Sequence, residues 1–269
     1  MSDIKLTNLQ ELQSWAKQAG FIYPSSEIYG GFQAVYDYGH YGYLLKENIK
    51  NEWIKAMSQD RDDIKLLDSA IFMSPKTWEA SGHVGGFSDV LIEDKKTNKR
   101  YRADHIIEDW MKDNAEFQNN KQKFIDSIQD EVVKNAIAKE DMDKLSPEQL
   151  TAIIELMDIK SPDGNELADA RNFNLLVKSN LGTTDSSFND ENVTYLRGET
   201  CQGIYLNYKN YIENMRVKIP FGIAQVGKAF RNEIIARQFV FRTREFEQME
   251  LQYFIHPEMN DEKYAEWKK

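Results

Sequence analysis

The chain has 269 residues, with 44 acidic and 34 basic side chains that give a formal net charge of −10 at pH 7. This acidic balance argues against a protein that coats nucleic acid, although a local basic patch is compatible with it. The single cysteine, Cys201, excludes an internal disulfide and a zinc site built from several cysteines, and it is typical of the reducing cytosol. No apolar run approaches the length that crosses a bilayer, so we expect no membrane segment, and with the single cysteine we expect a cytoplasmic protein.

The first part of the chain predicts helices and short strands separated by glycine turns. An amphipathic helix ends near Gly20, and residues 43–57 repeat apolar side chains at helical spacing. Residues 64–72 and 87–92 predict two apolar strands on either side of a loop-rich region, 74–86.

The middle of the chain changes in character. Residues 106–167 are charged, poor in glycine and rich in helix formers. Ser146, Pro147 and Gln149 form a capping-box pattern with proline at the first helical position, which predicts a helix start. Strand and turn patterns return from Phe173 onward. The predicted organisation is a first part of a sheet-rich core, a helical insertion and a second part of the core, residues 1–112, 113–168 and 169–269.

Residues 230–254 place charge where a buried strand should have none. They predict two strands joined by a basic loop, with Arg231 and Glu233 on one face of the first strand because successive side chains alternate. In the second strand we expect Met249, Leu251 and Tyr253 to form a core face. The other face carries aromatic and polar side chains, Phe246, Gln248, Glu250, Gln252 and Phe254.

This pattern suits a site for an anionic nucleotide and a cationic small molecule. Arginine forks match phosphate oxygens, an aromatic face can stack a base, and paired carboxylates can hold an ammonium group. The alternative is a solvated sheet face with surface ion pairs. Walker, Rossmann and nucleophile-elbow motifs are missing from the sequence, so a nucleotide site would be built from sheet arginines.

Residues 195–203 repeat this charge pattern, with Arg197 and Glu199 predicted on one strand face just before a glycine. Cys201 follows, and because no histidine is positioned by sequence to activate it, we predict a buried, inert thiol. The four histidines lack metal-ligand spacing, so we predict no zinc site. His83 alone reads as a structural residue, and Arg102 beside Asp104 reads as a surface ion pair.

Taken together, these segments resemble the dimeric glycyl-tRNA synthetases, which are class II aminoacyl-tRNA synthetases. Residues 30–53 are similar to motif 1, and residues 230–250 are similar to the strand–loop–strand of motif 2. Residues 195–203 resemble the substrate-binding strand of the family. Residues 78–84 and 102–104 resemble segments particular to the glycyl enzymes, and they make glycine the expected amino acid.

The resemblance implies an α+β fold, an antiparallel sheet flanked by helices with a helical insertion. It implies a ligase that activates glycine with ATP and transfers the glycyl group to tRNA(Gly). Mg²⁺ would arrive with ATP, no zinc is expected, and the protein would be a homodimer through the motif 1 region.

The resemblance also assigns site residues. Arg231 and Arg242 would be catalytic through contacts with the phosphates. The ATP-binding residues would be Arg231, Asn232, Glu233, Phe241, Arg242, Thr243, Arg244, Glu245 and Phe246. The glycine-binding residues would be Arg102, Glu199, Phe246, Glu247, Gln248, Met249 and Glu250.

The chain departs from the family at His40, Gly198, Cys201 and Ala236, and Gly198 removes a backbone restraint beside Glu199. The sequence ends after motif 2 without a segment that resembles motif 3. We therefore expect an incomplete part of a synthetase that is inactive alone. A non-catalytic synthetase-like paralogue, serving as a nucleic-acid or protein binding module, is the alternative.

Overall fold

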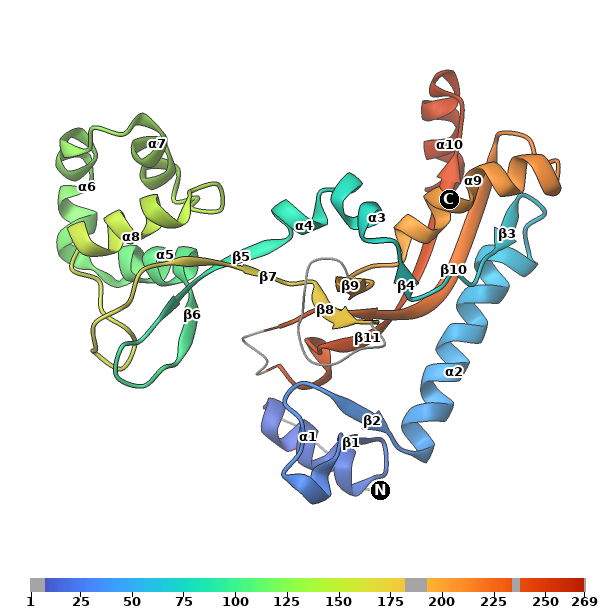
Figure 1. Cartoon of the computed structure of the whole chain (residues 1–269), viewed down its shortest axis with the longest axis horizontal. Helices are drawn as coiled ribbons and strands as arrows, with labels where there is room; N and C mark the ends of the chain where they lie inside the picture. Colours follow the sequence, from blue (N-terminus) through green and yellow to red (C-terminus); the bar gives the residue numbers. More distant parts are fainter. Residues whose placement is uncertain (1–7, 182–192, 234–237, 269) are drawn as a thin grey trace. The chain divides into compact units, whose positions relative to one another are not determined.

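The computed structural model describes residues 8–181, 193–233 and 238–268, and it divides into two units. One unit comprises Met1–Val84 and Leu176–Lys269, and the other comprises Gly85–Leu175. The elements are labelled in Figure 1. The helices and antiparallel strands described below confirm the predicted α+β class.

The first unit begins with a helix and a small hairpin. Helix α1 (Leu9–Gln18) starts at the capping residue Asn8, and strands β1 (Ile22–Pro24) and β2 (Tyr36–Tyr38) pair antiparallel. Helix α2 (His40–Ile54) then confirms the helix expected near 43–57, with a π-helical turn, Lys55–Gln59, at its end.

A sheet of long strands forms the centre of this unit. Strands β10 (Phe221–Phe230) and β11 (Glu245–Phe254) pair antiparallel, with Gln225 opposite Glu250. Strand β3 (Ile64–Leu66) runs parallel to β10. Helix α9 (Cys201–Asn214) packs on one face of the sheet (Figure 1). Its apolar side chains join those of the strands in a core of Ile204, Phe221 and Ile223, with Phe254 and Tyr208 against it.

A second, shorter sheet lies in the same unit. Strand β9 (Val193–Leu196) lies between β4 (Phe72–Met73) and β8 (Val177–Asn180), and both pairs are antiparallel. Helices α3 (Pro75–Ala80) and α4 (His83–Gly86) follow β4. The single strand predicted at 64–72 was therefore wrong, because β3 and β4 belong to different sheets.

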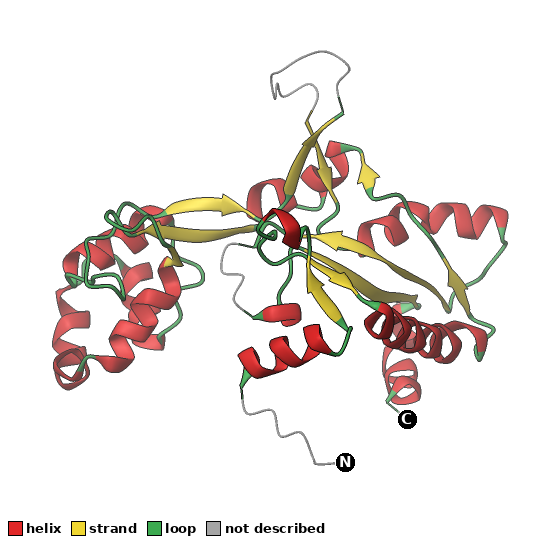
Figure 2. Ribbon diagram, turned by 90° about the horizontal axis from the view of Figure 1, so that it is seen from below, coloured by secondary structure: helices red, strands yellow, loops and turns green. Residues whose placement is uncertain are grey.

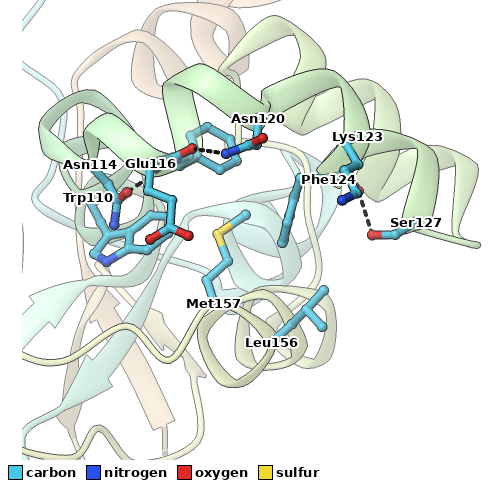
Figure 3. A pocket seen from close by; sticks show the side chains of 10 residues that line it. Trp110, Asn114, Glu116, Asn120, Lys123, Phe124, Ser127, Leu156 and Met157 are labelled. Atoms are coloured by element: carbon cyan, nitrogen blue, oxygen red, sulfur yellow. Dashed lines mark hydrogen bonds between the residues drawn. The ribbon is translucent and has the colours of Figure 1, made fainter.

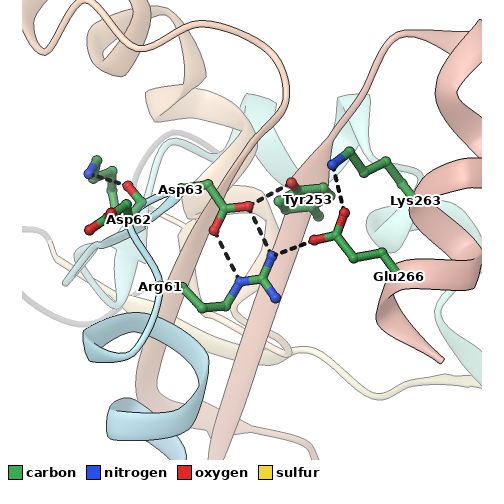
Figure 4. Close-up of polar contacts among 7 residues, drawn as sticks. Arg61, Asp62, Asp63, Tyr253, Lys263 and Glu266 are labelled. Atoms are coloured by element: carbon green, nitrogen blue, oxygen red, sulfur yellow. Dashed lines mark hydrogen bonds and ion pairs between the residues drawn. The ribbon is translucent and has the colours of Figure 1, made fainter. Parts of the chain in front are cut away.

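The predicted core face of the second long strand was also wrong. Met249 is 41% exposed, whereas Phe254 on the opposite face packs under α9. Tyr253 instead donates a hydrogen bond to Asp63, whose carboxylate also accepts from Arg61 (Figure 4). Arg61 further pairs with Glu266 of helix α10 (Asn260–Trp267).

The second unit is a strand ribbon with helices packed at one end (Figures 1 and 2). Strand β5 (Ser88–Glu93) pairs antiparallel with β6 (Arg100–Arg102) and β7 (Arg171–Asn174). The helices are α5 (Ala103–Asp113), α6 (Ala115–Ser127), α7 (Glu131–Lys139) and α8 (Pro147–Leu156).

The helices of this unit bury their own apolar core, which includes Ile107, Met111, Ile137 and Leu150. Helix α8 begins with the capping box predicted from Ser146 and Gln149, and that prediction is confirmed. The unit begins and ends further out than the predicted insertion, 113–168, because it also contains the three-stranded ribbon. No helix in the described part of the chain is long and apolar enough to cross a membrane.

Candidate active site

Arg231 lies where the first long strand ends. Strand β10 stops at Phe230, so the prediction that Arg231 and Glu233 share a strand face was wrong. The chain turns there instead, because the Glu233 amide donates to the Arg231 carbonyl at 2.8 Å. Arg231 Nε donates to the Gly198 carbonyl at 3.1 Å, and its guanidinium lies 5.4 Å from the centre of the Phe246 ring. A cation and an aromatic face, the pair expected for a phosphate and a base, are thus brought together.

The buried Glu233 accepts hydrogen bonds from two arginines at the end of the loop between the strands. Arg242 Nε donates to Glu233 Oε2 at 2.6 Å, and Arg244 Nε donates to the Glu233 carbonyl at 2.9 Å. Thr243 Oγ1 donates to the Glu245 carbonyl at 2.9 Å. The two arginines of the loop are therefore held by protein acceptors.

The other residues predicted to bind ATP lie around this loop. Asn232 is half-buried in the turn after β10, and Phe241 is 71% exposed. Glu245 begins β11 and forms an ion pair with Lys228 of β10. The family departure at Ala236 lies outside the described residues.

Two carboxylates are associated with Thr200, the residue before α9: Glu199 precedes it in the chain, and Glu250 bonds to its hydroxyl. Glu250 Oε2 accepts from Thr200 Oγ1 at 2.7 Å, and Glu250 Oε1 accepts from Gln252 Nε2 at 2.8 Å. The Thr200 amide also donates to Gln248 Oε1 at 3.1 Å. Strand β11 and the segment before α9 thus bring Gln248 and Glu250 to Thr200, the residue that follows Glu199.

Glu199 is held by donors from its own segment and from α4. Its Oε1 accepts from Gln202 Nε2 at 2.6 Å and from Cys201 Sγ at 3.1 Å, and it lies 3.1 Å from His83 Nε2. Burial raises the pKa of Glu199, but these bonds and the positive charge of Arg231 outweigh it and leave the pKa lowered. The carboxylate is therefore ionised at neutral pH.

Burial raises the pKa of Cys201 to about 12, and the Glu199 carboxylate adds to this effect. The thiol is half-buried, and at this pKa it is inert at neutral pH.

Arg197 and Glu199 do not share a strand face, contrary to the sequence prediction. Strand β9 ends at Leu196, and the Arg197 side chain is buried among backbone oxygens. Its Nε donates to the Lys228 carbonyl at 2.6 Å, and its Nη1 donates to the Ser69 carbonyl at 2.8 Å. Arg197 therefore joins β9 to β10 and to the segment before β4, and it supports the segment that carries Glu199.

Three other residues were predicted to bind glycine. Glu247 and Met249 are on the other face of β11, where Glu247 pairs with Lys46 of α2 at 2.9 Å. Arg102 belongs to the second unit, where it forms ion pairs with Asp104 and, at 3.3 Å, with Asp89. Their part in glycine binding stays a prediction.

Sequence reasoning missed two polar residues beside the carboxylates. Gln225 is 1% exposed in the middle of β10, where its Oε1 accepts from Ser69 and its Nε2 donates to the Thr200 carbonyl. A glutamine between the apolar residues Ala224 and Val226 was a usable signal, because a buried amide needs partners. His83 was read as structural, and its contact with Glu199 joins segments that are distant in the sequence.

A hollow of about 630 Å³ lies in the second unit and contains no predicted site residue (Figure 3). It is lined mainly by aromatic and amide side chains of α5 and α6 and by the end of α8, among them Trp110, Asn114, Phe124 and Met157. Among the described residues there is no group of three or more histidine, cysteine, aspartate or glutamate side chains able to hold a metal ion.

Comparison with known proteins shows what this chain is similar to. The family model of the tRNA synthetase class II core domain (G, H, P, S and T) matches residues 184–269. A glycine–tRNA ligase of Treponema denticola is 44% identical over 100% of this chain and 49% of its own length. A glycine–tRNA ligase of Chlorobaculum tepidum is 44% identical over 97% of this chain and 54% of its own length.

Among solved structures, the RNA binding domain of threonyl-tRNA synthetase from Cryptosporidium parvum Iowa II covers 94% of this chain at a TM-score of 0.49 and 13% identity, with 38% of that chain covered. This likeness is too weak to carry an argument. The chain spans about half the length of the curated relatives that it matches. Over its whole length the chain is similar to glycine–tRNA ligases, and residues 184–269 match the model of the class II core domain.

Proposed function

We propose that the protein containing this chain is a glycine–tRNA ligase and that the site on β10, β11 and the start of α9 activates glycine. A carboxylate oxygen of glycine attacks the α-phosphorus of ATP, the bond to pyrophosphate breaks, and glycyl-adenylate forms. A hydroxyl of the terminal ribose of tRNA(Gly) then attacks the glycyl carbonyl, and AMP leaves. The observation that carries the proposal is the meeting of Arg231, Glu199 and Glu250 around residues 198–200.

The two carboxylates suit an ammonium group. Glu199 has its Oε1 occupied by protein donors, whereas no contact to its Oε2 is found among the described residues. Glu250 is fixed by Thr200 and Gln252 and brings a second negative charge to the same segment. An amino acid with a side chain would be rejected if the pocket closed on the α-carbon, since steric exclusion of extra atoms is how small substrates are selected.

The nucleotide would lie on the arginine and aromatic side of the site. Arg231 would hold the α-phosphate, with Phe246 stacked on the adenine. Arg242 would exchange its bond with Glu233 for an outer phosphate, which frees the Glu233 carboxylate to accept from the adenine amino group. Asn232, Phe241, Thr243, Arg244 and Glu245 would line the remainder of the nucleotide site. Mg²⁺ would arrive with the phosphates of ATP and stabilise the negative charge on them.

A homodimer through the motif 1 region forms part of the proposal. Helix α2 leaves Tyr41, Leu44, Leu45 and Ile49 between 44% and 57% exposed. An apolar helix face of this kind marks a contact surface. Leu45→Glu should therefore shift the protein toward monomer in sedimentation velocity, and an unchanged dimer would exclude this face.

Binding of a glycyl-adenylate analogue tests the proposed site. Glycyl-sulfamoyl-adenosine, which cannot transfer its glycyl group, should bind the full gene product, and Arg231→Ala should weaken it about 100-fold because a charge-assisted phosphate contact is lost. Lys209→Ala, on the exposed side of α9, is the matched control and should bind like the parent. A parent that binds tRNA but neither the analogue nor ATP would support the non-catalytic paralogue instead.

A further inference from the structure

The two oxygens of the Glu199 carboxylate have different surroundings. Oε1 takes all the contacts found for this side chain in the described part of the chain, from Gln202 Nε2 at 2.6 Å, from Cys201 Sγ at 3.1 Å and from His83 Nε2 at 3.1 Å. Two of these groups belong to the first turn of α9, on the residues that follow Glu199. Among these three contacts, only His83 comes from a distant segment. It therefore restrains the Glu199 carboxylate when the segment that carries Glu199 moves.

His83 is itself held on its other nitrogen and on its ring. Ser81 Oγ lies 2.9 Å from His83 Nδ1, and the Ser81 hydroxyl lies 3.3 Å from the Trp78 carbonyl. The imidazole packs edge-on against the Trp78 indole, with ring centres 5.4 Å apart, and Trp78 is fully buried. When the Ser81 hydroxyl donates to Nδ1, the ring proton lies on Nε2, and Nε2–H can point at the carboxylate.

We propose that His83 is a positioning residue for glycine recognition: it holds Oε1 of Glu199 so that Oε2 meets the ammonium group of the substrate. The inference rests on the proposed function, since it assumes that Glu199 binds glycine. His83 acts through Glu199: the contacts described for it are with Glu199, Ser81 and Trp78, whereas Arg231 contacts Gly198 and Phe246. The loss of His83 should therefore weaken glycine binding and leave ATP binding unchanged.

Two substitutions separate the donor role from mere packing. His83→Gln keeps an N–H donor near the position of Nε2 and removes the aromatic ring. His83→Phe keeps a ring against Trp78 and removes the donor. If the N–H donor matters, His83→Gln preserves glycine binding and His83→Phe weakens it. If packing against Trp78 alone matters, His83→Phe preserves glycine binding and His83→Gln weakens it.

The test is the glycine KM and the ATP KM in glycine-dependent ATP–pyrophosphate exchange by the full gene product. We expect His83→Phe to raise the glycine KM about 10-fold or more, the effect of one lost hydrogen bond to a charged group, with the ATP KM within twofold of the parent. His83→Gln should stay within about threefold of the parent on the same reasoning. His256→Phe, at an exposed histidine after β11, is the matched control and should change neither KM.

The outcomes distinguish this inference from the function on which it rests. A parent without glycine-dependent exchange would refute the proposed function itself. An active parent with a His83→Phe variant of unchanged glycine KM, or with glutamine as harmful as phenylalanine, would refute only the role of His83. Should His83→Phe fail to fold, Ser81→Ala decides, because loss of the Nδ1 contact should raise the glycine KM alone; an unchanged value would overturn the inference.

Discussion

Replacing Gly227 with alanine should displace the buried Arg197 side chain and lower the free energy of unfolding. A Cβ at Gly227 would lie 2.2 Å from Nη2 of Arg197, and the Arg197 side chain is too deeply buried to move into solvent. The guanidinium would have to shift away from the Lys228 and Ser69 carbonyls, to which it donates at 2.6 and 2.8 Å. Hydrogen bonds of a charged group contribute about 1.5–3 kcal/mol each, so the loss of two bonds should cost about 3 kcal/mol or more.

Urea unfolding followed by tryptophan fluorescence measures this cost. With a slope near 3 kcal/mol per molar, a loss of about 3 kcal/mol lowers the midpoint by roughly 1 M. Gly85→Ala is the matched control, because a Cβ there meets no atom within 4 Å, and its midpoint should stay within about 0.2 M of the parent.

A double mutant tests whether the clash with Arg197 causes the destabilisation. In an Arg197→Met background the clash is absent, so Gly227→Ala should add less than about 1 kcal/mol to the destabilisation. A Gly227→Ala variant with the parental midpoint, or one whose full cost persists without Arg197, would refute the reasoning.

Three further predictions concern the two units. Because the pKa of Cys201 is raised to about 12, iodoacetamide should label the folded chain at pH 8 at least ~100-fold more slowly than the urea-unfolded chain, where the thiol pKa is ordinary, and equal rates would contradict the assignment. Burial raises the pKa of Asp94, but hydrogen bonds from Ser161, Asn165 and two backbone amides outweigh it and hold the pKa below its usual range. The stability that this group contributes is present above pH 4 and is lost as the pH falls further, so the free energy of unfolding of Asp94→Asn should fall less steeply with decreasing pH than that of the parent. Tyr253→Phe removes the 2.7 Å bond to Asp63 and should cost about 1 kcal/mol in urea unfolding at pH 7, whereas the same change at the exposed Tyr264 should cost nothing measurable.

Local patterns predicted the elements whose signals lie within a few residues of one another. The capping box at Ser146 and Gln149 needs only those two side chains and their backbone, and it forms as expected. Alternation in β11 placed Phe246, Gln248 and Glu250 on one face for the same reason. Which face is buried depends on the helix that covers it, and the strand pattern alone does not contain that information.

The errors arose where distant segments decide the outcome. The sequence pattern places Arg197 and Glu199 in equivalent positions of a charged strand. In the structure Arg197 donates to the backbone oxygens of Ser69 and Lys228, whereas Glu199 contacts His83. Strand alternation continued beyond Phe230 in the prediction, whereas the chain turns at Arg231. A buried arginine and a strand end both depend on partners that periodicity does not identify.

The most direct test of the central claim is ATP–pyrophosphate exchange by the full gene product with glycine, alanine or serine as the amino acid. The account predicts exchange with glycine and a kcat/KM for alanine that is lower by a factor of at least ~10, since even one extra methyl group is discriminated to that degree by a closed pocket. It also predicts that Glu199→Gln raises the glycine KM much more than the ATP KM. Exchange that is absent with glycine, or equally fast with alanine, would contradict the claim that Glu199, Glu250 and Arg231 form a glycine-activating site.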